Sequence, residues 1–162
     1  NVGVKQYGWL LSAQAIGGAL AGLVLSQIKS LKNQGKILIM SITMIGAGTI
    51  VFGTSRNFYL SMIALVIVGA SDSVSTVIRN TLRQLATPDH LRGRMTSINQ
   101  IFFSGGPHLG EFEAGMVGEW LGVQMAAITG GIACILGVQY IAKKFPILAN
   151  LDSEDDISLV NV

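Results

Sequence analysis

Charged side chains are scarce in this chain. Asp, Glu, Lys and Arg make up 12% of its 162 residues, about half of the roughly 25% that an ordinary soluble domain carries. The hydrophobic share is 50%, and the mean hydropathy is +0.55. The few charges are concentrated in short segments between apolar runs, whereas a soluble protein spreads them over its surface. The composition therefore argues against a soluble domain and predicts a membrane protein.

Cysteine and histidine are nearly missing as well. Cys134 is the single cysteine, so no disulfide is expected within the chain. The two histidines, His90 and His108, stand on different segments and leave too few ligands for a metal site. No H-E-x-x-H, G-x-S-x-G or Walker-type glycine sequence is present. We therefore expect no enzyme, no metal and no other cofactor. A net charge of +2 without a basic cluster gives no basis for nucleic-acid binding.

Five apolar segments are long enough to be membrane-spanning helices, for which a bilayer core requires about 20 residues. Short helix-breaking sequences separate them, at residues 33–35, 55–57, 88–89 and 122. With so little chain between them, consecutive helices are predicted to be antiparallel neighbours. The expected fold is an all-α membrane region over residues 1–149. Its predicted spans are 7–28, 37–54, 58–85, 95–121 and 123–142. Residues 150–162 are acidic and are expected to form a disordered tail.

The positive charges predict the orientation of these spans. If consecutive spans alternate in direction, nine of the 11 Lys and Arg residues fall on one side of the membrane. They are Lys29, Lys32, Lys36, Arg79, Arg83, Arg92, Arg94, Lys143 and Lys144. The other side carries only Lys5 and Arg56. Because cytoplasmic loops carry the excess of positive charge, we expect the rich side and the C-terminus to be cytoplasmic. The predicted location is the cytoplasmic (inner) membrane.

Asp72 stands inside the predicted span 58–85. A carboxylate at the middle of a bilayer costs roughly 2.5–3.5 kcal/mol, so it is expected to face a bundle interior or a watery cavity. Ser75, Thr76 and Arg79 follow at i+3, i+4 and i+7 and extend a polar stripe along the same side of the helix. Two roles stay open: an ion pair with Arg79, or proton exchange at Asp72. A third interpretation is a polar contact between helices or a hydrated position in the inner vestibule.

Two stretches resemble a known transporter family. Residues 85–95 have the sequence Leu-Ala-Thr-Pro-Asp-His-Leu-Arg-Gly-Arg-Met, and residues 105–110 have the sequence Gly-Gly-Pro-His-Leu-Gly. Together they resemble helix 11 and the loop before it in the transmembrane secretion effector branch of the major facilitator superfamily, which includes enterobactin-exporter-like proteins. Residues 7–13, followed by Gly17, Gly18 and Gly22, are similar to helix 8 of that superfamily. The resemblance covers residues 7–145.

The resemblance implies that the chain holds helices 8 to 12, part of the C-terminal six-helix bundle of a major facilitator fold. The first seven helices would belong to a missing N-terminal half. The sequence starts with Asn1 and not with a methionine, so we also expect it to be part of a longer protein. The implied function is secondary active transport, in which a proton antiporter exports a small drug- or siderophore-type substrate by alternating access. The alternative is a non-transporting membrane scaffold or partner subunit made of the same helices.

Glu111 and His108 form a second candidate site in the predicted span 95–121. His108 lies three residues before Glu111, so the two share a helix face and are expected to pair. A His–Glu pair is able to titrate near neutral pH, which suits a proton or substrate pathway. The family to which the resemblance points usually has small or apolar residues where Glu111 and Glu113 stand. The alternative is an acid near the outer end that reaches the lipid headgroups.

Gly105, Gly106, Pro107 and Gly110 predict a kink in the same helix. Pro removes one backbone hydrogen bond, and the glycines allow a neighbouring helix to approach. The string resembles the G-P-x-x-G element of helix 5 in exporters of the superfamily. The alternative is a packing kink without a role in transport.

The loop before that helix contains Pro88, Asp89, Arg92, Gly93 and Arg94. Asp89 is expected to cap the following helix, and the two arginines are donors for helix C-terminal carbonyls or for an acidic partner. The resemblance implies a cytoplasmic gating loop that latches the two halves of a transporter. The alternative is anchoring of the arginines at the lipid headgroups.

Overall fold

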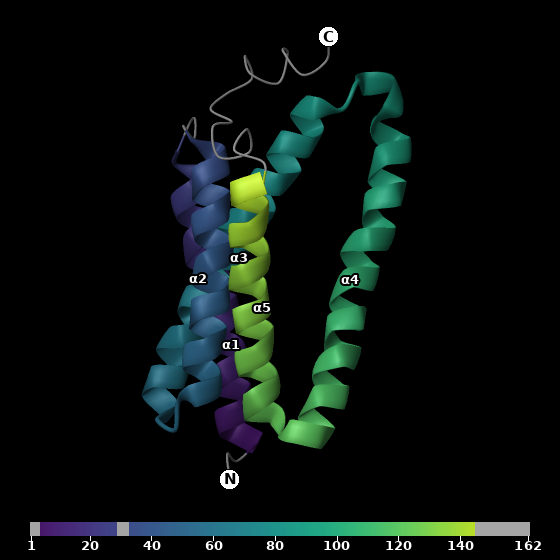
Figure 1. Ribbon diagram of the computed structural model, residues 1–162. Helices are drawn as coiled ribbons and strands as arrows, with labels where there is room; N and C mark the ends of the chain where they lie inside the picture. The colour runs from purple at the N-terminus through teal and green to yellow at the C-terminus, as the bar shows by residue number, and fades with distance from the viewer. Residues whose placement is uncertain (1–3, 29–32, 145–162) are drawn as a thin grey trace.

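The structure, a computed structural model, describes residues 4–28 and 33–144, and these residues form five α-helices and one short 3-10 helix (Figure 1). The elements are α1 (Val4–Ser26), α2 (Gln34–Thr54), α3 (Phe58–Ala86), η1 (Asp89–Leu91), α4 (Arg92–Leu121) and α5 (Val123–Lys144). The predicted all-α membrane fold is confirmed. Each helix overlaps one predicted span, and no end differs by more than three residues. Lys29, Lys32 and the predicted acidic tail 150–162 lie outside the described residues.

The helix ends follow from the breaking residues in the sequence. The Asn57 side chain caps α3 by accepting a hydrogen bond from the Tyr59 N–H at 3.0 Å. At the other end of α3, the Thr87 hydroxyl donates to the Arg83 carbonyl at 2.7 Å. Gly122 separates α4 from α5 with a φ of 87°, in the left-handed region that glycine adopts without strain.

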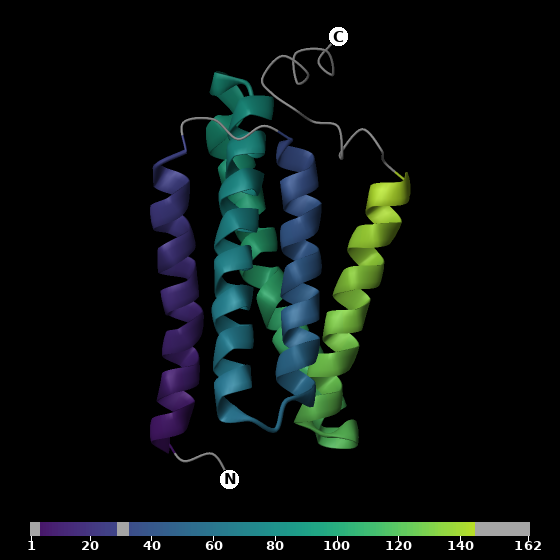
Figure 2. The same cartoon turned by 90° about the vertical axis from the view of Figure 1, so that its left-hand side faces the viewer.

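Four helices stand side by side in one layer. Figure 2 shows them in the order α1, α3, α2, α5. Helices that follow one another in the chain run in opposite directions, so the neighbours α1 and α3 are parallel. The predicted alternation of direction is therefore present, but two consecutive pairs are not packed as neighbours: α3 lies between α1 and α2, and α4 packs on α5 instead of α3. The separation between Ser26 and Gln34 leaves enough chain to span one intervening helix. Packing contacts, and not the length of the connection, consequently decide which helices touch.

Glycines allow these helices to approach closely. At the crossing of α1 and α3, a Cβ on Gly17 would collide with the Val66 carbonyl, and a Cβ on Gly69 with the Gln14 carbonyl. At the crossing of α2 and α5, a Cβ on Gly131 would lie 2.7 Å from the Gly46 carbonyl oxygen. Many of the buried side chains of these helices are small too, among them Ala13, Ser41, Ala64, Ser71 and Ser75.

Helix α4 differs from the other four. It packs against α5 and otherwise stands apart from the layer (Figure 1). Among the described residues, α1, α2, α3 and α5 are long and apolar enough to cross a membrane, and α4 is not among these candidates. The reason is composition: its 30 residues include two arginines in the first turn and three glutamates in the last eleven residues. The predicted span 95–121 is thus a helix of sufficient length but of higher polarity than the others.

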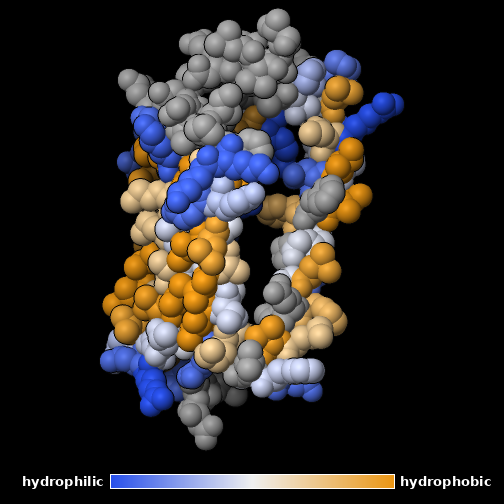
Figure 3. Space-filling view, viewed as in Figure 1, coloured by the Kyte–Doolittle hydropathy of each residue, from blue (hydrophilic) through white to orange (hydrophobic). Residues whose placement is uncertain are grey.

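The surface has the pattern of a membrane protein. Figure 3 shows hydrophobic side chains around the middle of the molecule and hydrophilic ones toward its two ends. Large apolar side chains are exposed on the surface of several helices, for example Trp9, Met40, Leu136 and Phe112. Such surface is unfavourable in water and favourable in lipid.

Candidate functional site

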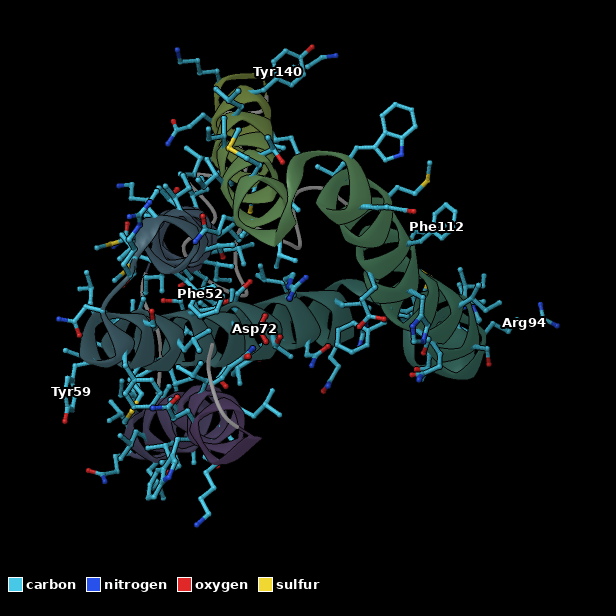
Figure 4. All side chains as sticks on the ribbon, turned by 90° about the horizontal axis from the view of Figure 1, so that it is seen from below. Phe52, Tyr59, Asp72, Arg94, Phe112 and Tyr140 are labelled. Carbon is cyan, nitrogen blue, oxygen red and sulfur yellow. The ribbon has the colours of Figure 1, made fainter. Side chains whose placement is uncertain are left out.

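Asp72 is the central residue of α3, with fourteen residues on either side. Figure 4 shows it near the centre of the cross-section, whereas Tyr59, Arg94, Phe112 and Tyr140 lie at the periphery. Its side chain is exposed rather than enclosed by the described helices. A carboxylate at this depth needs water or a polar partner, so the space that it faces is a candidate site.

That space is an open groove of about 460 Å³ between α1 and α3. Gln14 from α1 and Asp72 and Ser73 from α3 supply its polar groups. The remaining lining residues are small or apolar: Leu11, Ala15, Gly18, Ala19 and Gly69. The Asp72 and Gln14 side chains make no hydrogen bond to another described residue, so a carboxylate and an amide are both available to a ligand or to water.

The contact between α1 and α3 forms the base of this groove. Gly69 precedes Asp72 by three residues, so it lies on the same side of α3 one turn away. At Gly69 the backbones touch, because a Cβ there would collide with the Gln14 carbonyl. A Cβ on Gly18 would lie 2.8 Å from the Ser73 hydroxyl oxygen. The same glycines that join the helices therefore position Gln14 beside Asp72.

An ion pair with Arg79, one of the roles left open for Asp72, is not seen among the described residues. Arg79 instead donates from Nε to the Ser75 carbonyl at 3.3 Å and from Nη2 to the Thr76 hydroxyl at 3.2 Å. Groups three and four residues back are the natural neighbours of a helical side chain, whereas seven residues correspond to about 10 Å along the axis. Asp72 is consequently not neutralised from within its own helix by Arg79.

The residues of the predicted polar stripe on α3 do not share one environment. Ser75 is only 1% exposed, and its hydroxyl has no hydrogen-bond partner among the described residues. It belongs to the buried side of α3 with Ala64, Ser71 and Ile78. Asp72 faces the open groove, and Ser75 does not line it. A rotation of about 60° between i and i+3 is enough to place them in different surroundings.

The structure brings His108 and Glu111 together on α4. His108 Nδ1 lies 3.3 Å from Glu111 Oε2. Their side chains are 78% and 76% exposed, and neither lines the groove at Asp72. Nearer the start of α4, the Gln100 amide donates to the Ser104 hydroxyl at 3.3 Å. The polar groups of α4 and Asp72 thus form separate sites in the described part of the chain.

The predicted gating loop forms the turn between α3 and α4. Asp89 lies in η1, and α4 begins only at Arg92, with Leu91 in the N-cap position and no side-chain cap. The capping expected of Asp89 concerns a side chain outside the described ones, so it stays a prediction. Pro88 and Arg94 line a shallow, largely apolar pocket of about 320 Å³. The roles predicted for Arg92, Gly93 and Arg94 in gating stay predictions.

Helix α4 continues through the predicted kink sequence as one unbroken helix, Arg92–Leu121. A Cβ added at Gly105, Gly106 or Gly110 would meet no other described atom within 4 Å. The expected close approach of a neighbouring helix is thus not seen within the described residues. The physical reason is that α4 stands apart from α1, α2 and α3 here.

Gln14 and Gly18 are site residues that the sequence-based prediction missed. Gln14 carries the polar amide of an otherwise apolar segment, Gly8–Ser26, that is long enough to span a membrane. That isolated polarity was the available signal. Nothing in the sequence indicated that Gln14 lies near Asp72, because the two residues come from helices that are not consecutive.

The described architecture defines a class of protein: a multi-pass membrane protein with a polar groove at the middle of its helices. The sequence matches the transmembrane secretion effector family over residues 1–161. The chain belongs to this family of major facilitator superfamily transporters, as the sequence resemblance predicted.

A curated relative is also found. The chain is 25% identical over 148 residues to a protein named "Multidrug efflux pump Tap" from Mycolicibacterium fortuitum. The match covers 91% of this chain and 36% of the relative, so the chain spans about a third of the relative's length. No solved structure matches.

Proposed function

We propose that this chain supplies the C-terminal helices of a proton-coupled exporter of small molecules that works by alternating access. In this proposal, residues upstream of the chain supply the other half of the transporter and the other wall of the substrate path. The family membership supports a transport role, and the name of the curated relative supports efflux. The coverage of 36% of that relative is in keeping with a partial transporter.

The observation that carries the proposal is the surroundings of Asp72. It lies at the centre of an apolar helix, faces an open polar groove and makes no ion pair with Arg79. A carboxylate kept in the membrane for structure alone would be paired or hydrogen-bonded. A carboxylate that faces an accessible groove is suited to accept a proton from one side and to release it on the other.

Transport in everted membrane vesicles tests this function. Vesicles from cells that express the whole protein are energised to make the lumen acidic, and accumulation of ethidium is followed by fluorescence. We expect accumulation above that of vesicles without the protein. We also expect nigericin, which dissipates the pH gradient, to reduce it to background. Accumulation that persists after nigericin would show that protons do not drive the transport.

The proposed orientation places the ends that carry Lys36 and Lys144 in the cytoplasm and Lys5 and Arg56 outside, as the positive-inside rule predicts. Single cysteines at these positions in a Cys134→Ala background are expected to separate in labelling of intact cells by an impermeant maleimide. Positions 5 and 56 should be labelled at once, and positions 36 and 144 only after permeabilisation. Equal labelling of positions 36 and 56 in intact cells would contradict the topology.

A further inference from the structure

A pocket of about 500 Å³ lies between α2 and α5, at the end of the molecule where α2 leads into α3 and α4 leads into α5 (Figure 2). We call it the Arg56 pocket. Its lining residues are Gly53, Thr54, Arg56, Gly122, Val123, Gln124, Met125 and Ile128. The two helices touch beside it, because a Cβ on Gly53 would lie 3.1 Å from the Gln124 carbonyl oxygen. The pocket is therefore built where α2 and α5 meet.

Arg56 is the only charged residue among the described residues that line this pocket. It is exposed, and it makes no hydrogen bond or ion pair with another described residue. The Gln124 amide, on the opposite wall, is exposed and has no described partner either. Glu119 is the acid closest to this lining along the chain, and it does not line the pocket. The pocket thus carries one positive charge that no described carboxylate pairs with.

The position of the pocket is that of lipid headgroups. Tyr59, three residues after Arg56, is 75% exposed, and Trp120, two residues before Gly122, is 83% exposed. Exposed Trp and Tyr side chains gather at the level where a membrane meets water. Ile128 lies four residues beyond Gln124 on α5, about 6 Å further toward the middle of the helices. The lining consequently changes from polar at the headgroup level to apolar toward the bilayer core.

From the unpaired charge, the apolar floor and this position, we propose that the Arg56 pocket binds an anionic glycerophospholipid. Its phosphate accepts hydrogen bonds from the Arg56 guanidinium, whose planar set of N–H donors matches phosphate oxygen atoms. The Gln124 amide binds the glycerol region, and the start of one acyl chain lies on Met125 and Ile128. In the orientation proposed above, this lipid belongs to the outer leaflet.

The charge and the lining favour this occupant over two others. A zwitterionic lipid would cover the apolar floor but carries no net charge to compensate Arg56. A soluble phosphate ion would bind the guanidinium but leave Met125 and Ile128 uncovered. An anionic lipid satisfies both parts of the pocket at once.

Native mass spectrometry of the whole purified protein tests the charge. The protein is equilibrated in mixed micelles with equimolar phosphatidylglycerol and phosphatidylcholine, and the bound lipids are counted after the micelle is removed. We expect phosphatidylglycerol to be retained in preference. Arg56→Gln should lower this preference by about fivefold, as expected for one charge near an anionic lipid. Arg56→Lys should retain most of it. Lys5→Gln removes a lysine of the same end that is outside the lining, so it should leave the preference unchanged.

A matched pair of tryptophan variants on α5 tests the apolar floor. Ile128 lines the pocket, whereas Ile132, one turn further along, is 44% exposed and outside the lining. Ile128→Trp is expected to reduce bound phosphatidylglycerol, and Ile132→Trp is expected to retain it.

Three results would overturn the proposal. The first is a wild-type preference in Arg56→Gln. The second is an equal loss in Lys5→Gln, which would show a general effect of surface charge. The third is displacement of the lipid by soluble glycerol phosphate, which would assign the pocket to a soluble anion.

Discussion

Asp72→Asn is expected to reduce export driven by the pH gradient to the level of vesicles without the protein. Asparagine keeps the size and the polarity of the side chain, but it removes the protonation on which exchange depends. Asp72 faces an open groove and holds no ion pair with Arg79, so its neutralisation does not leave that cation without a partner. Membrane abundance should therefore stay close to that of the wild-type protein.

Two control variants make this result specific. Asp72→Glu keeps an ionisable carboxylate in the groove and should retain measurable transport. Arg79→Gln loses only hydrogen bonds to Ser75 and Thr76, so it should change neither transport nor abundance greatly, and it should not rescue Asp72→Asn. If Asp72→Asn exports normally, Asp72 has no role in proton exchange. If its abundance falls and Arg79→Gln restores it, the ion pair exists in the assembled protein.

Gly17→Ala is expected to destabilise the protein strongly for a change of one methyl group. The new Cβ would collide with the backbone of Val66 on α3, and a backbone cannot rotate away as a side chain does. Overpacking of this kind costs about 1–3 kcal/mol. For a chain of this size, a loss of about 2 kcal/mol lowers Tm by about 4–8 °C. The measurement is thermal unfolding of the detergent-purified protein.

Gly22→Ala is the matched control, because Gly22 is on the same helix and a Cβ there would meet nothing within 4 Å. Alanine has a higher helix propensity than glycine, so the stability of this variant should be unchanged or slightly raised. The Gly17 variant should also lower export, since α1 carries Gln14 into the groove beside Asp72. Equal Tm values for the two variants would show that α1 and α3 do not cross at Gly17.

The helices themselves were predictable from the sequence because their signals are local. An apolar run of about 20 residues and the breakers at Asn33, Asn57, Pro88 and Gly122 determine where a helix begins and ends. Asp72 was recognisable for the same reason, since a charge within such a run is costly wherever the helix packs. The pairing of His108 with Glu111 is local too, because residues three apart meet on any helix.

The partners of each helix depended on the tertiary structure. The sequence by itself determined five helices, their alternation and the apolar character of four of them. It did not determine that α3 lies between α1 and α2, that Gln14 stands beside Asp72, or that Ser75 is buried away from it. Those features depend on which glycines meet across helices, and such contacts join residues far apart in the chain. The sequence also left open whether Arg79 pairs with Asp72. In the structure Arg79 donates to the nearer oxygen atoms of Ser75 and Thr76, and only the packed structure shows which acceptors are within reach.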